Sequence, residues 1–477
     1  MKAVLINPPA FEGTLYVREG RCEQRLSSFQ YNMVPISLLT TAAVLRQQGH
    51  DVRVIDAIAR ELTPAELLEE LRAFDPRLIL ASVATATFRG DARVAAAIRK
   101  AIPGAFLVGF GVHVTALPEE SLLEASGFDA VIRREPEVTA AELARALSGS
   151  SALSGVAGLS YRSGDGAIRH NTDRPFLEDL DSLPFPARDL VDHRLYPAPL
   201  DRRPHTLVIT SRGCPFRCTF CTARLYYGRK QRRRDPVLVV DEIERASREL
   251  GLRLFTFWSD TFTLDRAHVL ALCREIERRG LRIEWMANSR VDCVDVPLLR
   301  EMRAAGCSIV SFGVESGVQE LLDRMRKGSR LEQAAQAFEA CRAVGLRSAA
   351  HFILGLPGET PATIRETLRF ARRLRPDFVQ FYGAIPFPGT DYHREALREG
   401  SLVARDWSDY EINRCIVRSP ELSREQLQRW RQRAYLTTYM SPRFIAARLT
   451  EIRSPREFGR IVRAGVHFLC DWVFPAR

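Results

Sequence analysis

The 477-residue chain lacks any long hydrophobic run, since no apolar stretch reaches the roughly 20 residues that cross a bilayer. It also lacks a secretory signal pattern, because residues 1–7 are typical of a short buried strand that runs into Pro8 and Pro9. Hydrophobic residues make up 46% of the chain and charged residues 27%, which is typical of a soluble globular protein. We therefore expect a cytoplasmic protein without a membrane span.

A disulfide framework and a nucleic-acid-binding module are also absent. Seven of the ten cysteines stand singly, which suits a reducing compartment and residues that pack in the core: Cys22, Cys273, Cys293, Cys307, Cys341, Cys415 and Cys470. The net charge of +11 comes from arginine. Charge alone does not choose between nucleic acid, an anionic membrane surface and an anionic substrate, but without a recognised module we expect no nucleic-acid partner.

The three remaining cysteines, Cys214, Cys218 and Cys221, have the spacing C-x3-C-x2-C. They directly follow the apolar run 206–210, so we expect them on a loop at the end of a strand. Three thiolates on one short loop suit three corners of a four-iron cluster and leave the fourth iron open to a small molecule. The alternatives are chance clustering and a zinc site, which normally needs a fourth Cys or His nearby that this region does not convincingly supply.

This spacing, with Phe220 just before the last cysteine, resembles the cluster loop of the radical S-adenosylmethionine (SAM) superfamily. The resemblance implies a [4Fe-4S] cluster whose open iron binds the amino and carboxylate groups of SAM. It also implies that an electron from the cluster cleaves SAM to a 5'-deoxyadenosyl radical.

Residues 1–147 alternate apolar strands with helical periods, a series that builds a doubly wound, Rossmann-like parallel sheet. The expected strands are 3–6, 51–55, 78–83, 106–109 and 130–132, and the expected helices are 36–47, 64–73, 91–101, 118–125 and 139–147. Ligands of such sheets bind beyond the carboxyl ends of the strands. The expected ligand loops are therefore 7–11, 56–60, 82–88 and 109–114.

This region resembles the cobalamin-binding domain that precedes many radical SAM enzymes, through Asn7-Pro8-Pro9, residues 49–52 and the segment GFGVHVTALP at 109–118. The resemblance implies cobalamin contacts from Gly109, Gly111, His113 and Thr85. Glycine lets the backbone approach a bulky planar ligand. His113 has two readings, a cobalamin contact or a residue that only fixes its loop.

Two features depart from that family. No Asp-x-His-x-x-Gly motif occurs, and residues 56–60 offer no histidine to cobalt, so cobalamin would bind without a histidine ligand or not at all. Residues 133–137 read RREPE where the family usually has a Gly-Glu stretch. A Rossmann-like domain that no longer binds cobalamin stays open as the alternative.

Residues 148–205 are expected to connect two domains, with a hairpin around 164–166 and a proline-fixed linker at 183–187. A second strand-helix series fills residues 206–400 and predicts a partial (β/α)6 barrel with its chemistry at the carboxyl ends of the strands. The expected strands are 206–210, 253–258, 282–287, 308–313, 346–354 and 378–384, with helices such as 237–250 and 331–344 between them.

Several strand ends resemble SAM-contacting segments of the radical SAM superfamily. Asp260 would hold the SAM amino group, since an ammonium needs a carboxylate or carbonyl acceptor. Arg290 has two equal readings, a contact to the SAM carboxylate or a structural ion pair. Glu315 resembles the residue that meets the SAM ribose or methionine, and Gly355 belongs to a segment, 352–359, that resembles the adenine-contacting one.

Residues 401–477 are expected to form a helical, arginine-rich extension. In 456–474, apolar residues recur at helical spacing with arginines on other faces. This segment either packs on the barrel or touches an anionic membrane as an interfacial helix.

The resemblance as a whole implies a cobalamin-dependent radical SAM enzyme that takes a hydrogen atom from an unactivated carbon and transfers a methyl group from methylcobalamin. It implies an electron donor such as flavodoxin or ferredoxin and a small-molecule or lipid-like substrate. Two alternatives stay open: a cyclase or other bond-forming oxidoreductase acting on a porphyrin, hopanoid or similar molecule, and a non-catalytic cobalamin or iron–sulfur sensor. The loop 223–234, with Tyr226 and Tyr227, either faces the substrate or presents its basic run to solvent.

Overall fold

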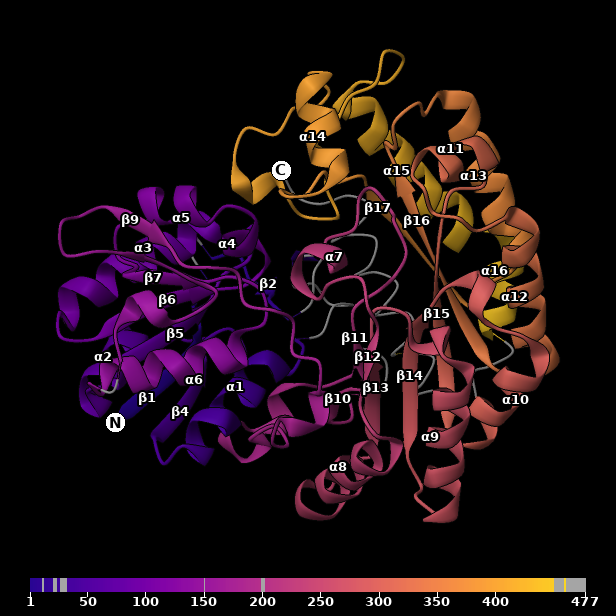
Figure 1. Cartoon of the computed structure of the whole chain (residues 1–477). Helices are drawn as coiled ribbons and strands as arrows, with labels where there is room; N and C mark the ends of the chain where they lie inside the picture. The colour runs from indigo at the N-terminus through magenta and orange to yellow at the C-terminus, as the bar shows by residue number, and fades with distance from the viewer. Residues whose placement is uncertain are drawn as a thin grey trace.

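The computed structural model describes residues 1–10, 13–19, 24–25, 32–149, 151–198, 202–449 and Gly459. Two sheets lie side by side, the first within the indigo and purple part of the chain and the second within the magenta to orange part (Figure 1). No helix in the described ranges is long and apolar enough to cross a membrane. The amphipathic helix expected at 456–474 falls outside the described residues, apart from Gly459.

The first sheet has the order β4-β1-β5-β6-β7-β8-β9. Its parallel strands are β4 (Asp51–Asp56), β1 (Lys2–Asn7), β5 (Leu78–Ser82), β6 (Phe106–Phe110) and β7 (Ala130–Ile132). The hairpin of β8 (Leu159–Arg162) and β9 (Ile168–His170) extends it antiparallel. The direction in which strands are added reverses between β1 and β5, and doubly wound sheets bind ligands beyond the strand ends at such a point.

Helices cover both faces of the first sheet, as the predicted doubly wound fold requires. One face packs against α1 (Ile36–Gln47) and α6 (Pro136–Leu147), and the other against α2 (Pro64–Phe74), α3 (Phe88–Ala101) and α5 (Pro118–Glu124). Helix α6 begins three residues before the predicted start, because Pro136 occupies the first helical turn, where its missing N–H is not needed. A short helix, α4 (Val112–Ala116), and the small pair β2 (Tyr16–Val17) and β3 (Gln24–Arg25) were not predicted.

The second sheet is the predicted set of six parallel strands, which lie side by side in chain order. They are β10 (His205–Ile209), β13 (Leu254–Trp258), β14 (Glu284–Ser289), β15 (Cys307–Glu315), β16 (Arg347–Leu354) and β17 (Phe378–Gly383). The core of this domain joins the strands to helices on the outer face: α8 (Pro236–Leu250), α9 (Arg266–Arg278), α10 (Val296–Ala304), α12 (Leu331–Ala343) and α13 (Pro361–Leu374). Two shorter helices, α11 (Gln319–Arg324) and α14 (Asp391–Arg398), follow strand ends.

The described part of the C-terminal extension is helical, with α15 (Arg424–Tyr439) and α16 (Pro442–Leu449). Helix α15 packs on β17, where the hydroxyls of Tyr435 and Tyr439 bond the backbone of Phe381 and Val379. This extension therefore supports the last strand of the sheet.

The inner face of the second sheet is only partly filled. Outward residues such as Trp285, Phe312 and Phe352 are buried against the helices. Their inward neighbours stay half-buried or exposed: Met286, Asn288, Ser311, His351, Ile353, Gln380 and Tyr382. A closed (β/α)8 barrel packs its interior with side chains. We call the space above these inward residues the lumen.

Candidate functional site

The cysteine loop leaves the sheet through a short neck in which β11 (Ser211–Arg212) pairs with β12 (Arg232–Arg233). Gly213 has φ +90°, and a Cβ there would lie 2.2 Å from the carbonyl oxygen of Lys230. Only glycine fits this turn without strain. The backbone N–H of Gly213 donates to Asp260 Oδ2 at 2.7 Å, which ties the neck to the end of β13.

The three cysteines of this loop are half-buried, and each sulfur has a polar neighbour. Cys214 Sγ lies 3.7 Å from Thr261 Oγ1. Arg290 Nη1 donates to Cys218 Sγ at 3.9 Å, and the backbone N–H of Ala223 donates to Cys221 Sγ at 3.5 Å. Burial raises the pKa of the Cys218 thiol to about 11, which iron coordination reverses because it deprotonates the thiol.

In the described part of the chain, no three His, Cys, Asp or Glu side chains converge as ligands of one metal ion. A four-iron cluster makes a different demand, because each thiolate binds a different iron at its own corner. Three cysteines spread along one loop fit that demand better than they fit a single zinc ion. The donor set therefore suits the expected cluster.

Three of the four residues expected to contact SAM surround this loop. Asp260 accepts from Gly213, as described above. Arg290 bonds Asp292 at 2.8 Å and the carbonyl oxygen of Lys327 at 2.7 Å, so the structural ion pair is present. Glu315 pairs with Lys327 Nζ at 2.6 Å, and both are buried. Lys327 was not predicted from sequence, because it follows an ordinary turn after α11 and carries no motif.

Gly355, the fourth expected SAM contact, is connected to the cysteine loop through Tyr392. Its N–H donates to the buried Glu359 carboxylate, and its carbonyl oxygen accepts from Tyr392 Oη at 3.1 Å. The backbone N–H of Tyr392 donates to the carbonyl oxygen of Thr219, within the cysteine loop. All four candidates thus lie within one connected set of contacts around the cysteines.

A cavity of about 540 Å³ of empty space, partly continuous with solvent, lies where the two domains meet. The first domain lines it with residues from strand ends, loops and the first turn of α1: Arg18, Glu19, Ser37, Leu38, Ser82, Val83, Ala84, Phe110, Gly111 and Val112. The second domain contributes Tyr226 and Tyr227, at and just after α7 (Ala223–Tyr226), together with Trp258. Helix α7 begins two residues after Cys221 and lies between the two sheets (Figure 1).

Of the residues expected to contact cobalamin, only Gly111 lines this cavity. Thr85 and His113 are buried, and Gly109 packs against Val83. The His113 ring packs between Phe88 and Trp407, with centroids 4.3 and 4.9 Å away, and burial lowers its pKa to about 3. These contacts favour the interpretation in which His113 fixes its loop, and its role toward cobalamin stays a prediction.

The lining combines backbone and flat or aliphatic side chains with the charged Arg18 and Glu19, which suits the apolar ring and the polar side chains of a corrin. Among the described residues, no histidine lines it. Asp56, where the family motif begins, is instead buried and accepts from Tyr196 Oη at 3.0 Å. The residues present fit a cobalamin whose cobalt has no histidine ligand from the protein.

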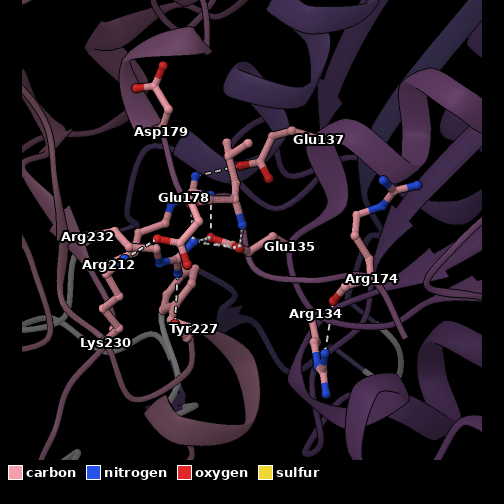
Figure 2. Close-up of polar contacts among 12 residues, drawn as sticks. Arg134, Glu135, Glu137, Arg174, Glu178, Asp179, Arg212, Tyr227, Lys230 and Arg232 are labelled. Carbon is pink, nitrogen blue, oxygen red and sulfur yellow. Dashed lines mark hydrogen bonds and ion pairs between the residues drawn. The ribbon is translucent and has the colours of Figure 1, made fainter. Parts of the chain in front are cut away.

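Beside the cavity, four buried charges join the domains, and we call them the interdomain ion network: Arg212, Arg232, Glu135 and Glu137. Figure 2 shows the two guanidinium groups converging on Glu135. Arg232 belongs to the basic run 232–234, whose role the sequence left open. Within that run Arg232 and Arg234 are buried, and Arg234 pairs with Glu242, while only Arg233 is exposed.

Comparison with known proteins assigns this arrangement to a family. Residues 208–371 match the model of the radical SAM superfamily, and residues 25–144 match the B12 binding domain. A protein of Pyrococcus horikoshii described as an uncharacterized methyltransferase is 34% identical over 412 residues, 86% of this chain and 89% of that protein. The chain belongs to the radical SAM superfamily.

Other relatives of this radical SAM enzyme differ in the reactions their names describe. The anaerobic magnesium-protoporphyrin IX monomethyl ester cyclase of Rubrivivax gelatinosus is 28% identical over 437 residues, 90% of this chain and 77% of the cyclase. The solved structure of the radical SAM methyltransferase TsrM from Kitasatospora setae, with cobalamin and a [4Fe-4S] cluster, superposes with a TM-score of 0.68 at 20% identity. The match covers 86% of this chain and 81% of TsrM, and it establishes the shared fold.

Proposed function

We propose that this radical SAM enzyme transfers a methyl group from methylcobalamin to an unactivated carbon of a small molecule. The observation that carries the proposal is the cavity shared by the B12 binding domain and helix α7, directly after the last cysteine. A ring bound there would contact Gly111, beside the buried cluster that Val112 forms with Tyr226 and Tyr227. The shared cavity supports direct transfer between groups held by the two domains, and the methyltransferase relative supports the reaction type.

In this proposal each set of residues has a distinct part. Cys214, Cys218 and Cys221 would hold three irons of a [4Fe-4S] cluster, and Asp260, Arg290, Glu315 and Gly355 would contact SAM. Together the bound groups supply a 5'-deoxyadenosyl radical and a transferable methyl group. The protein's own residues orient these groups and exclude water.

We place the substrate in the lumen, close to a polar chain on β16 and β17. Tyr382 Oη donates to Gln380 Oε1, so His351 Nδ1 donates to Tyr382 Oη, at 2.9 Å. Burial lowers the pKa of His351, and the neutral ring then keeps Nε2 as an acceptor. The remaining charge near His351 belongs to the paired Glu315 and Lys327. This supports an uncharged substrate group that donates an O–H or N–H hydrogen bond.

As a radical SAM enzyme, the protein needs a reductant. We infer a one-electron donor protein such as flavodoxin or ferredoxin. The exposed side chain of Arg217, between the first two cysteines, supports an acidic donor surface. Peripheral membrane contact through 456–474 stays a prediction, because that segment lies outside the described residues.

The test uses anaerobically purified, cluster-reconstituted enzyme with a reductant, SAM and cobalamin, and it follows 5'-deoxyadenosine, S-adenosylhomocysteine and bound cobalamin together. We expect wild type to retain cobalamin and to form both nucleosides, Cys218→Ala to form neither, and Cys341→Ala, in the core on α12, to resemble wild type. Deoxyadenosine without cobalamin or S-adenosylhomocysteine would favour the cyclase-like reaction of the Rubrivivax relative. An intact cluster that forms no deoxyadenosine would contradict the catalytic proposal.

A further inference from the structure

The neck of the cysteine loop contains an unfavourable pair of like charges. Arg212 and Arg232 lie directly opposite each other in the β11–β12 ladder. Like charges at such cross-strand positions destabilise the pairing. The two-stranded neck is also too short to be stable by itself. Its pairing therefore depends on a group that neutralises both arginines.

Glu135 is that group, and it comes from the other domain. Its carboxylate accepts from Arg212 Nη1 at 3.0 Å and from Arg232 Nη1 at 2.9 Å through both oxygens. Glu137 accepts from Arg212 Nη2 at 2.5 Å. All four side chains are at most 7% exposed, so two positive and two negative charges balance away from water. Removal of one member leaves an uncompensated buried charge.

Glu135 is also connected to the wall of the cavity through its neighbour Arg134. It directly precedes α6, after the carboxyl end of β7. Next to it, the backbone N–H of Arg134 donates to Thr115 Oγ1 at 2.9 Å, and that hydroxyl donates to the carbonyl oxygen of Gly111 at 2.7 Å. The segment that neutralises the neck therefore also holds the loop that lines the cavity.

We propose that Glu135 is a positioning residue that orders the neck of the cysteine loop only when the B12 binding domain is docked against it. It thereby fixes the cavity relative to the cysteines, and with it the approach of cobalamin to SAM. The effect on catalysis rests on the proposed function. The coupling between the docked domain and the neck does not, because it needs no bound cofactor.

The first arm of the test needs no cofactor. Amide hydrogen exchange is measured across residues 211–213 and 231–234 in wild type, Glu135→Gln and Glu178→Gln. Glu178 is the matched control, because it pairs with Lys230 in the same region but both side chains are exposed (Figure 2). We expect at least tenfold faster exchange in the neck of Glu135→Gln and no change in Glu178→Gln.

A second variant separates charge repulsion from general damage. Glu135→Gln leaves two buried arginines for one carboxylate, whereas Glu135→Gln/Arg232→Met leaves one arginine, Arg212, with Glu137. We expect the double variant to recover most of the lost protection. Neck exchange in Glu135→Gln that equals wild type, or a double variant worse than the single one, overturns the proposal.

The second arm uses the loaded enzyme with titanium(III) citrate as the reductant. When cob(I)alamin takes the methyl group of SAM, a Co–C bond forms, the S–CH3 bond breaks and S-adenosylhomocysteine leaves. Deoxyadenosine instead needs the cluster, SAM and one electron, which release methionine and the 5'-deoxyadenosyl radical, and a hydrogen atom that this radical takes from a substrate or from the buffer. We expect Glu135→Gln to lower the ratio of S-adenosylhomocysteine to deoxyadenosine at least tenfold at unchanged iron content, and to weaken the magnetic coupling between cob(II)alamin and the reduced cluster.

The two proposals fail in different ways. Wild type that forms deoxyadenosine but no S-adenosylhomocysteine contradicts the methyl transfer, and the exchange measurements then decide the role of Glu135. If wild type forms both products and Glu135→Gln loses both equally, Glu135 has only a structural role and the positioning proposal is wrong.

Discussion

The guanidinium of Arg290 lies over the ring of Phe216, with its central carbon 3.6 Å from the ring centroid. Phe216 stands between the first two cysteines, and Arg290 follows β14. The same guanidinium bonds Asp292 and the carbonyl oxygen of Lys327. One side chain therefore attaches the cysteine loop to the ends of two strand-helix units.

Arg290→Lys should loosen the cysteine loop, because lysine lacks the planar group that stacks and bonds at several points. We expect a loss of about 1–2 kcal/mol in the free energy of unfolding and less than half the iron content of wild type after reconstitution. Denaturant unfolding and iron analysis measure the two effects. Arg266→Lys, at an exposed ion pair with Asp295, is the control and should change neither. Equal iron content in both variants would count against the role of Arg290.

Gly111→Ala should displace the loop after β6 that lines the cavity. Gly111 has φ +134°, and a Cβ there would lie 2.2 Å from the carbonyl oxygen of Val83. The loop must move away from β5, at a cost of about 1–3 kcal/mol for the backbone conformation alone. We expect cobalamin affinity, followed by its visible absorbance, to fall at least tenfold. Gly104→Ala meets no atom within 4 Å and should bind cobalamin as wild type does.

His113→Phe should leave cobalamin affinity unchanged, because the ring packs between Phe88 and Trp407. The pKa of His113 falls to about 3 on folding, so below pH 6.5 the unfolded chain binds more protons than the folded one and stability decreases as the pH falls. The phenylalanine of the variant does not titrate, so the variant does not lose this stability at low pH. From pH 7 to pH 5 it should gain about 2 kcal/mol relative to wild type in the free energy of unfolding. A tenfold weaker cobalamin affinity would instead make His113 a ligand contact.

Glu359→Gln should stabilise the enzyme at alkaline pH. Burial raises the pKa of Glu359 to about 8, so between about pH 4.5 and 8 the folded chain binds more protons than the unfolded one. Stability from this group is therefore lost as the pH rises through that window, by up to about 5 kcal/mol. Glutamine keeps an acceptor for the Gly355 N–H without the ionisation. Between pH 6 and pH 9, the midpoint of thermal unfolding should decrease less in Glu359→Gln than in wild type or in the control Glu339→Gln, whose side chain is exposed.

Local patterns in the sequence predicted the parallel strands of both sheets and the cysteine loop, but not that the hairpin β8–β9 joins the first sheet. Strand and helix periods identify buried faces locally, and the boundaries of α1 agree with the prediction residue for residue. The C-x3-C-x2-C spacing needs no distant partner to be recognised, because three ligands from one loop are a local property. Prolines and glycines mark the ends of elements because their backbone preferences are also a local property.

Which side chains meet depends on how the two domains pack. Glu135 and Arg212 are 77 positions apart, and nothing local distinguishes their buried pair from two exposed charges. The structure likewise directs His113 toward Trp407 and assigns Gly111 to a close approach with Val83. Pairing across domains depends on how the two sheets dock, and docking depends on the sum of many weak contacts that no single segment of the sequence contains.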